Sequence, residues 1–490
     1  MVAEWAYQQS PSVLDPGRNC WRIERADRAA LIVDACDYFH HARKAMLAAE
    51  AQILMIGWDF DTRIILDDAD DDAPATLGSF ISWMARNRPQ VAVHILRWDL
   101  GATKLLARGT TVFRLVNWAR TSQINFKLDG AHPPGASHHQ KIVVIDDKLA
   151  FCGGIDMTAT RWDTREHRDG DERRKRPTTG RHYMPWHDST MALDGAAARA
   201  LGTLARERWT TAGGEALPTP DVSGDPWPDE LAPQFRDVEV AIARTRGAHR
   251  ELPEIREIEA LFVDMIARTR RYFYAENQFF ASRVVAEAIG KRLAEPDGPE
   301  FVIVNPRIVE GWVEEEVMSP ARAQLLQMLR KADRHGRLQI YTPVTRDGCD
   351  IYVHSKITIV DGELLRIGSA NLNNRSMGLD SECDVLIDAG RKANEGAGEQ
   401  IGAILCDLLA EHLGVEAAAV EARFEATGSL VRTVEALRGS GRTLVPLAIE
   451  EPNALETAIA EGEVLDPEGA GEYFEPQARG GLLGRLRIWR

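Results

Sequence analysis

Two short segments of the chain contain residue types that could carry out chemistry on a phosphodiester. One runs from His139 to Asp146 and the other from His354 to Asp361, and in each a Lys stands two residues after the His. An imidazole can attack phosphorus or transfer a proton near neutral pH. An ammonium group can neutralise the charge of a phosphate. The residue types therefore predict two copies of one catalytic motif.

The spacing of the two segments indicates an internal duplication. A single H-x-K pattern is usually a surface accident, but here five chemically matched pairs share one offset, 354 − 139 = 215. A duplication predicts two similar halves related by a pseudo-twofold axis. The pairs are His139 and His354, Lys141 and Lys356, Asp146 and Asp361, Gly153 and Gly368, and Asp156 and Asn371.

A strand at each motif would place its catalytic groups on one face. Side chains two residues apart on a strand point the same way, so each His projects together with the following Lys. The pseudo-twofold axis could bring both pairs to one electropositive site that suits an anionic phosphodiester. One His could attack phosphorus and the other donate a proton and later accept one. Asp146 and Asp361 end strands before turns, so we expect them to brace the fold.

Several longer segments resemble the phospholipase D superfamily, most closely its eukaryotic-type branch. The resemblance covers roughly residues 52 to 414. It implies an α/β fold of two similar lobes related by a pseudo-twofold axis, with sheets flanked by helices and the active site in the cleft between the lobes. It also implies ping-pong phosphatidyl transfer without a metal. The segments that carry it are Gly153–Asp156, Arg161–Asp163, Pro185–Asp188, Glu276–Phe280 and Gly368–Ser376.

The resemblance also implies roles for individual residues. His139 would be the nucleophile and His354 the general acid. Asp156, which replaces the Asn of the second motif, would make one side of the pocket more acidic, and we expect it to be structural. The residues implied to bind phosphate oxygens are Lys141, Lys356, Asn371 and Ser369.

In the family an acidic residue usually orients each histidine. Counting back six residues from Asp388 and Asp194, at the ends of matching strands, leads to Glu382 and Asp188. We therefore predict these two as the orienting acids. Asp163 is a competing candidate for Asp188, which could instead be a solvated carboxylate at a strand edge.

Helical and strand patterns alternate in the same order in both halves. The first half begins with a predicted helix over Ala30–Ala49 and a strand over Gln52–Gly57. A segment rich in Pro, Gly and Asp, Thr211–Gln234, predicts a linker. We expect a first lobe over residues 1–215, a linker over 216–235, a second lobe over 236–427 and an acidic C-terminal tail over 428–490.

The end of the tail changes character. Glu450–Glu475 contains nine acidic residues and no Lys or Arg, whereas Gly480–Arg490 is apolar and basic. Leu and Trp on one side with Arg beside them are typical of a segment that lies at a membrane surface. The alternative, which we favour, is that this segment docks on the body of the protein or on the acidic stretch.

Charge and cysteine usage limit the class of protein. The net charge of −15 argues against a broad nucleic-acid-binding surface, although a local basic pocket is compatible with it. The six cysteines show no C-x-x-C spacing, which argues against a disulfide scaffold or a zinc cluster. Met1–Cys20 lacks the pattern of a secretory signal, and no apolar run is long enough to cross a bilayer. These features favour the cytoplasm, with peripheral membrane contact an open expectation.

The predicted function is hydrolysis or exchange of phospholipid head groups, with water or an alcohol as the acceptor. Two alternatives are a nuclease of the same superfamily and a non-catalytic lipid-binding relative. The acidic composition weighs against the nuclease, and the intact motifs weigh against the binding protein. We expect no cofactor and no catalytic metal, because two His and two Lys supply nucleophile, acid and neutralising charge. The sequence does not predict the head group or the oligomeric state.

Overall fold

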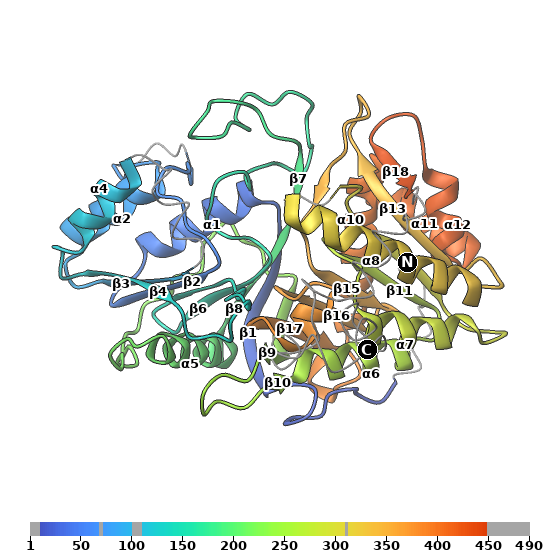
Figure 1. The fold of residues 1–490 in the computed structure, drawn as a ribbon, viewed down its shortest axis with the longest axis horizontal. Helices are drawn as coiled ribbons and strands as arrows, with labels where there is room; N and C mark the ends of the chain where they lie inside the picture. Colours follow the sequence, from blue (N-terminus) through green and yellow to red (C-terminus); the bar gives the residue numbers. More distant parts are fainter. Residues whose placement is uncertain (1–9, 68–71, 100–109, 309–311, 448–490) are drawn as a thin grey trace, which may run out of the picture.

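The computed structural model describes residues 10–67, 72–99, 110–308 and 312–447. The fold is mixed α/β, with one very large sheet flanked by helices (Figure 1). The elements of the first half are β1 (Arg22–Val33), α1 (Ala35–Leu47), β2 (Gln52–Gly57), α2 (Leu77–Asn87), β3 (Ala92–Trp98), α4 (Thr110–Trp118), β4 (Ile124–Asp129), β5 (Ile142–Ile145), β6 (Leu149–Gly153), β7 (Trp186–His187), β8 (Ser189–Asp194) and α5 (Gly195–Thr211).

The second half repeats this order and then continues. Residues 212–234, which join the halves, form neither helix nor strand. The elements that follow are β9 (Phe235–Arg246), β10 (Ile255–Arg256), α6 (Glu257–Arg268), β11 (Tyr272–Glu276), α7 (Arg283–Leu293), β12 (Glu300–Val304), α8 (Trp312–Ala332), β13 (Leu338–Val344), β14 (Tyr352–Val353), β15 (Ile357–Val360), β16 (Leu364–Gly368), α9 (Asn374–Gly378), β17 (Glu382–Asp388), the 3-10 turn η1 (Lys392–Asn394), α10 (Ala397–Leu413), α11 (Ala417–Thr427), α12 (Leu430–Leu437) and β18 (Thr443–Pro446).

The order of strands shows the duplication directly. The main path runs β18-β13-β12-β11-β15-β16-β17-β9-β1-β8-β6-β5-β2-β3-β4. Outward from the central β9–β1 pair, the strands of the two halves follow in matching order, from β17 and β8 to β13 and β4, and β18 is an additional edge strand of the second half. β1 and β9 are antiparallel, with Arg22 opposite Ile242 and Ala29 opposite Phe235. The two halves therefore share one continuous sheet and are related by a pseudo-twofold axis at its centre.

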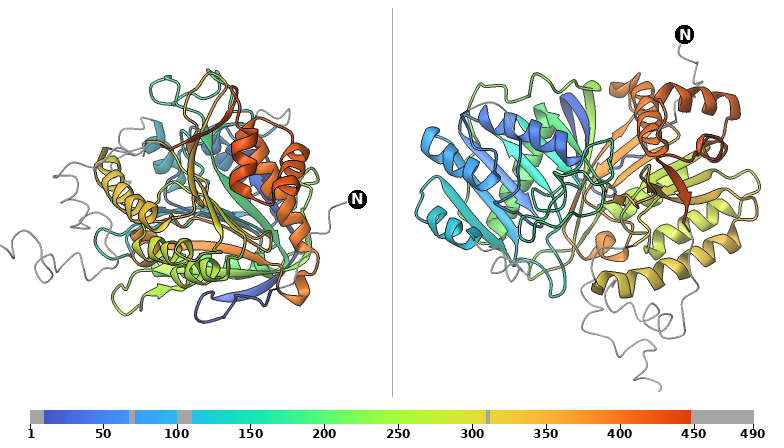
Figure 2. Two further views of the ribbon diagram at one scale, coloured as in Figure 1. Left: turned by 90° about the vertical axis from the view of Figure 1, so that its right-hand side faces the viewer. Right: turned by 90° about the horizontal axis from the view of Figure 1, so that it is seen from above.

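Three hydrophobic clusters cover the sheet. One packs α1 and α2 on the first half, and a second packs α6, α7 and α8 on the second half. The third joins α5 with α10, α11 and α12 and includes buried residues from both halves. Figure 2 shows the two halves side by side with helices on both faces of the strands. Burial of the sheet on both faces fixes the strands that carry the motifs.

Two expectations about the elements need correction. The predicted helix over Ala30–Ala49 begins only at Ala35, because residues up to Val33 belong to β1 at the centre of the sheet. A central strand is buried on both faces and shows no alternation, so its apolar run does not differ from that of a buried helix.

The predicted tail also starts too early. Leu430–Leu437 forms α12 and Thr443–Pro446 forms β18, which pairs with β13 at the edge of the sheet. Glu300 fixes the start of α12 by accepting hydrogen bonds from the backbone of Leu430 and Val431. The acidic stretch and the basic apolar segment, Gly480–Arg490, lie outside the described residues. None of the described helices has the length and apolar character to span a membrane.

Candidate active site

The two H-x-K segments are aligned by backbone pairing that crosses between the halves. His139 N donates to the carbonyl of Ser381 at 2.9 Å, and His354 N donates to the carbonyl of His187 at 2.8 Å. In both cases the acceptor immediately precedes a predicted orienting acid. Each motif therefore lies against the acid-bearing segment of the opposite half.

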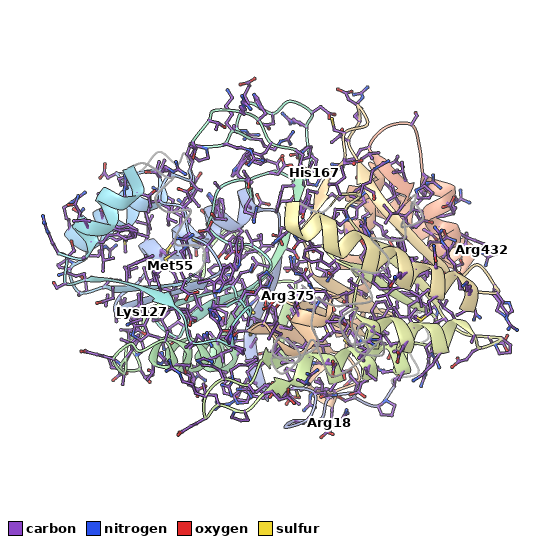
Figure 3. All side chains as sticks on the ribbon, in the orientation of Figure 1. Arg18, Met55, Lys127, His167, Arg375 and Arg432 are labelled. Carbon is purple, nitrogen blue, oxygen red and sulfur yellow. The ribbon has the colours of Figure 1, made fainter. Side chains whose placement is uncertain are left out.

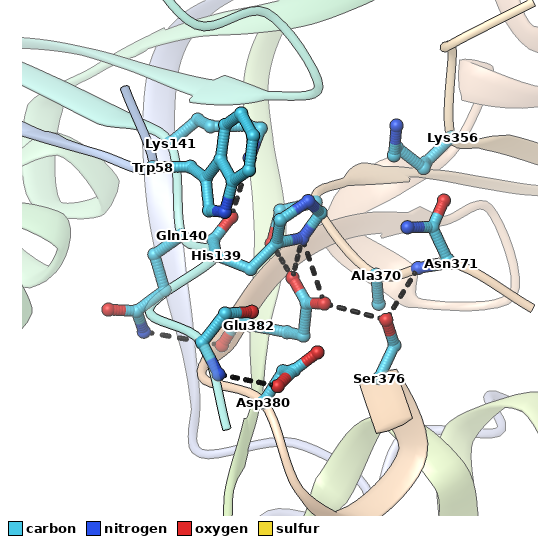
Figure 4. Close-up of polar contacts among 12 residues, drawn as sticks. Trp58, His139, Gln140, Lys141, Lys356, Ala370, Asn371, Ser376, Asp380 and Glu382 are labelled. Atoms are coloured by element: carbon cyan, nitrogen blue, oxygen red, sulfur yellow. Dashed lines mark hydrogen bonds and ion pairs between the residues drawn. The ribbon is translucent and has the colours of Figure 1, made fainter. Parts of the chain in front are cut away.

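The imidazole of His139 is oriented by Glu382 from the second half. Its Nδ1 lies 3.0 and 2.9 Å from the two carboxylate oxygens. The same carboxylate accepts hydrogen bonds from the hydroxyls of Ser369, at 2.5 Å, and Ser376, at 2.7 Å. Figure 4 shows Glu382 between the His139 ring and Ser376. Because Nδ1 is engaged, Nε2 is the nitrogen of His139 that is left for chemistry.

The imidazole of His354 is oriented by Asp188 from the first half. Its Nδ1 lies 2.6 Å from Asp188 Oδ2, while Asp188 Oδ1 accepts from the backbone N of Ser189 at 2.8 Å. The Trp186 ring lies 5.2 Å from the His354 ring, and the Arg161 guanidinium stacks 4.2 Å from the Trp186 centroid. The structure thus pairs each histidine with the acid of the other half.

The two lysines of the motifs are buried but differ in their partners. Lys141 Nζ lies 3.1 Å from Asp156 Oδ2 and donates to the carbonyl of His139 at 2.9 Å. Lys356 Nζ donates to the carbonyl of His354 and lies 3.5 Å from Gln278 Oε1. Within the described residues, no carboxylate forms an ion pair with Lys356. Its positive charge is therefore the less neutralised of the two.

The predicted phosphate ligands from the second half fall into two groups. Asn371 lies beside Lys356 and the His139 ring in Figure 4, and its buried Oδ1 has no hydrogen-bond partner among the described residues. Ser369 needs correction. Its hydroxyl donates to Glu382 and accepts from the backbone N of Cys383 at 3.0 Å. Because both functions of the hydroxyl are used behind the histidine, Ser369 supports the acid and does not face the substrate.

Asp163, the competing candidate for an orienting acid, lies elsewhere. Its carboxylate accepts from Arg174 at 2.9 Å and from the backbone N of Trp186 at 2.8 Å, and it contacts His167 at 3.0 Å. The structure therefore places Asp188, and not Asp163, on His354.

The remaining motif carboxylates hold the backbone. Asp146 accepts from the backbone N atoms of residues 50, 51 and 52, which precede or begin β2. Asp361 accepts from residues 270, 271 and 272 before β11 in the same way. Asp156 accepts from the backbone N of Trp58 at 2.9 Å besides its contact with Lys141. These contacts fix the ends of the strands next to the site.

Two residues in the site were quoted in the sequence only as parts of longer segments. Ser376 donates to Glu382, and Arg161 lies next to the Trp186 ring that faces His354. They occupy equivalent places, since 376 − 161 equals the repeat offset of 215. Extending the offset beyond the five matched pairs would have found both.

Burial and the neighbouring positive charges lower the pKa of both imidazoles. Burial and the ammonium groups of Lys141 and Lys356 hold the pKa of His139 well below its ordinary value. Burial, Lys356 and Arg161 do the same to the pKa of His354. Burial lowers the pKa of Lys356 to about 7 and raises the pKa of Glu382 to about 8. A bound phosphodiester anion would favour the protonated imidazole and would therefore raise the pKa of a histidine beside it.

The arrangement supplies the parts for displacement at phosphorus. A neutral imidazole with Nδ1 fixed by Glu382 presents Nε2 as a nucleophile. A second imidazole, fixed by Asp188, can exchange a proton with a leaving or entering oxygen. Lys141, Lys356 and Asn371 surround the same space with positive charge and amide donors.

Family models match most of both halves. Residues 45–225 match the model described as Phospholipase D, and residues 263–399 match the model described as Cardiolipin synthase, PLD-like domain. Both H-x-K motifs and both orienting acids lie inside these ranges.

Curated relatives are similar at low identity. Phospholipase D A of Dictyostelium discoideum is 24% identical over 416 residues, covering 71% of this chain and 32% of that protein. Phospholipase D zeta 2 of Arabidopsis thaliana is 22% identical over 572 residues, covering 80% and 54%. Cardiolipin synthase of Geobacillus kaustophilus is 23% identical over 273 residues, covering 54% and 44%. The chain therefore spans about a third to about half of the length of these relatives.

One solved structure shares the fold over most of both chains. The phosphatidylserine synthase of Haemophilus influenzae Rd KW20 has a TM-score of 0.50 at 14% identity, covering 78% of this chain and 88% of that chain. At this identity the likeness concerns the fold alone.

Proposed function

The chain belongs to the phospholipase D superfamily, and we propose that it hydrolyses or transfers the head groups of phospholipids through a phosphohistidine intermediate. The superfamily accounts for phosphodiester chemistry of the phospholipase D type. The observation that carries the finer proposal is the crossed pairing of His139 with Glu382 and of His354 with Asp188.

In the first step His139 Nε2 attacks phosphorus. A P–N bond forms, the bond from phosphorus to the oxygen of the leaving alcohol breaks, and His354 donates its proton to that oxygen. The proton is available because the anionic substrate and Asp188 favour the imidazolium form of His354. Lys141, Lys356 and Asn371 stabilise the charge on the equatorial oxygens.

In the second step the neutral His354 accepts a proton from water or an alcohol. The new oxygen attacks phosphorus, the P–N bond breaks, and His139 regains its lone pair. Glu382 keeps the proton of His139 on Nδ1 in both steps, so the tautomer does not have to change. Its contacts with Ser369 and Ser376 limit its own movement.

Phospholipids are the proposed substrates because similar proteins carry the names phospholipase D and cardiolipin synthase. Such a substrate requires the protein to meet a lipid surface, so peripheral membrane contact is part of the proposal. Water and a primary alcohol are the proposed acceptors.

The test is to incubate purified protein separately with phosphatidylcholine, phosphatidylglycerol and single-stranded DNA, with and without a short primary alcohol. We expect release of a lipid head group, formation of a phosphatidyl alcohol and loss of both with His139→Asn. Cleavage of DNA alone would indicate a nuclease. Lipid binding without turnover would indicate a non-catalytic relative.

A further inference from the structure

A second cluster of histidines and carboxylates lies behind the catalytic acid and takes no part in the proposed chemistry. It consists of Asp34 between β1 and α1, His167 from the loop before β7, His187 in β7, and Glu411 in α10. All four are buried, and one side-chain atom from each lies within 4.8 Å of the others. Figure 3 shows His167 next to β7, where the first half meets the second.

The separations of these atoms suit ligands around a common centre. His167 Nε2 lies 3.1 Å from Glu411 Oε1 and 3.6 Å from Asp34 Oδ2. His187 Nδ1 lies 2.9 Å from Glu411 Oε1 and 3.5 Å from Asp34 Oδ1. Ligands about 2.0–2.2 Å from a tetrahedral zinc ion are about 3.3–3.6 Å apart. The four distances above, 2.9 to 3.6 Å, are near that separation, and one atom from each residue lies within 4.8 Å of the others.

Two of the atoms lack a hydrogen bond although they are buried. Asp34 Oδ2 and His187 Nδ1 have no hydrogen-bond partner within the described part of the chain. His187 Nδ1 nevertheless lies 2.9 Å from Glu411 Oε1, within ion-pair distance. An unsatisfied buried carboxylate oxygen is costly. A cation in the cluster would bind Asp34 Oδ2.

The second nitrogen of each imidazole contacts a further carboxylate. His167 Nδ1 lies 3.0 Å from Asp163 Oδ2, and His187 Nε2 lies 2.8 Å from Glu276 Oε2. This is the support typical of metal-bound histidines, in which a carboxylate accepts from the outer N–H and fixes the tautomer. The other nitrogen of each ring faces Glu411 Oε1, His167 Nε2 through a hydrogen bond of 3.1 Å and His187 Nδ1 at 2.9 Å, and would release its proton to bind a cation.

Charge around the cluster is compatible with a divalent cation. The carboxylates of Asp34, Asp163, Glu276 and Glu411 face two guanidinium groups, Arg165 on Glu411 and Arg174 on Asp163. With both imidazoles neutral, as metal binding requires, and the half-exposed Asp407 set aside, these described residues carry a net charge of −2, which one divalent cation would neutralise. With both imidazoles protonated, the same residues are balanced without a cation.

We propose that Asp34, His167, His187 and Glu411 bind a structural zinc ion. Two imidazoles and two carboxylates in a closed, buried site suit zinc better than calcium or magnesium, which prefer oxygen ligands and water. The ion joins the first half to α10 of the second half. It also holds Asp34, whose Oδ1 accepts from the backbone N of Asp188 at 3.0 Å and thereby positions that acid.

This site is separate from the proposed chemistry. The two catalytic histidines already present nucleophile and acid without a metal, and none of the four proposed ligands is in the H-x-K motifs. The proposal therefore does not rest on the lipid substrate and can be tested without an activity assay.

The first test measures metal bound to the full-length protein purified from zinc-supplemented medium. Elemental analysis should find one zinc per chain, and Asp34→Asn and His167→Gln should lower this to less than about a tenth. His412→Gln is the matched control. It removes another buried histidine of the same region, which contacts Glu276 at 3.1 Å from the opposite side, and it should retain the zinc.

A second measurement uses the wild-type protein alone, in case the variants do not fold. After chelation under mild denaturant and refolding, added zinc should raise the midpoint of thermal unfolding. Cobalt in its place should show the visible absorption of four-coordinate Co²⁺. X-ray absorption should find nitrogen and oxygen ligands without sulfur.

Several outcomes would overturn the proposal. The first is protein without zinc whose melting temperature does not respond to zinc or chelation. Zinc that carries a sulfur ligand would instead belong to an exposed thiol such as Cys349. Loss of zinc in H412Q but not in D34N would assign the ion to His187, Glu276 and His412.

Discussion

Glu382 and Asp188 occupy matching places in the two halves, but their surroundings differ. Glu382 accepts from two serine hydroxyls in addition to His139. Asp188 has one backbone donor in addition to His354. The residues that match Ser369 and Ser376 at the offset of 215 are Gly154 and Arg161. A Cβ on Gly154 would lie 2.2 Å from Asp188 Oδ1, so a serine there would force Asp188 out of its present position.

The two lysines also differ, in whether a carboxylate offsets their charge. Lys141 is balanced by Asp156, whereas the residue that matches Asp156 is Asn371, which leaves Lys356 without a carboxylate partner in the described residues. The side chain of His139 is also more exposed than that of His354, 14% against 5%. A fully symmetric site would not distinguish nucleophile from acid. These substitutions break the symmetry of the site, as the proposed division into nucleophile and acid requires.

The largest effect is expected from substitution of His139, the proposed nucleophile. His139→Asn should lower kcat by on the order of 10⁵-fold or more and abolish covalent phosphate labelling, because it removes the nitrogen proposed to form the P–N bond. Acid quench with a labelled substrate measures the intermediate. If labelling persists in H139N and disappears in His354→Asn, the roles of the two histidines are reversed.

Removing the acid should have a smaller and substrate-dependent effect. His354→Asn should slow turnover of a phospholipid by roughly 10²–10⁴-fold. With a nitrophenyl ester the first step should largely recover, because this leaving group needs little protonation. Pre-steady-state release of nitrophenol measures that step. Equal losses with both substrates would contradict the assignment of His354 as a proton donor.

Substitution of each lysine tests whether the charge of Lys356 is offset less than that of Lys141. Lys356→Ala and Lys141→Ala should each lower kcat/KM by on the order of 10²–10³-fold with little change in unfolding midpoint. The K356A loss should be the larger, because Asp156 already offsets part of the charge of Lys141. Double substitution of Lys141 and Asp156 should cost less than K141A alone. Equal losses of kcat/KM in K141A and K356A would contradict the inference that Asp156 offsets the charge of Lys141.

The dependence of kcat/KM on pH tests the same difference between the lysines without removing either side chain. Burial lowers the pKa of Lys356 to about 7, so its ammonium form is lost as pH rises through that value, and kcat/KM should fall on the alkaline side. Lys356→Arg keeps its charge and should move this limb to higher pH, at a lower maximum. Lys141→Arg is the matched control and should leave the limb in place. An unmoved limb in K356R would assign it to another group.

The smallest expected effect concerns the support of Glu382. Ser376→Ala removes one donor and should lower kcat by about twofold to tenfold with KM nearly unchanged. Ser376→Thr keeps the hydroxyl and should recover most of the loss. If both variants lose the same activity, the shape of the residue matters and its hydrogen bond does not.

The sequence predicted the parts of the site that repeat locally. The H-x-K motifs have a fixed spacing on a strand and occur twice, and the acids could be found by counting along matched strands. The sequence did not reveal that the acids are exchanged, because this depends on the pairing of His354 with His187 and of His139 with Ser381, residues that are far apart in the chain.

The features that were missed have a common physical cause. β1 was predicted as the start of a helix because a strand buried on both faces has no alternation. Ser369 was assigned to phosphate because a motif gives the position of a hydroxyl but not its direction. The proposed zinc ligands, at positions 34, 167, 187 and 411, have no common spacing and come together only in the folded chain.

The exchange of acids also bears on ancestry. A single ancestral half would have carried a histidine and an acid that could not meet within one molecule, so its working form would have been a pair of identical chains joined at the edge now formed by β1 and β9. Fusion after gene duplication made that pairing permanent. Only in a fused chain can one copy carry Asp156 and Arg161 where the other carries Asn371 and Ser376. The asymmetry of the present site is therefore younger than its two-part construction.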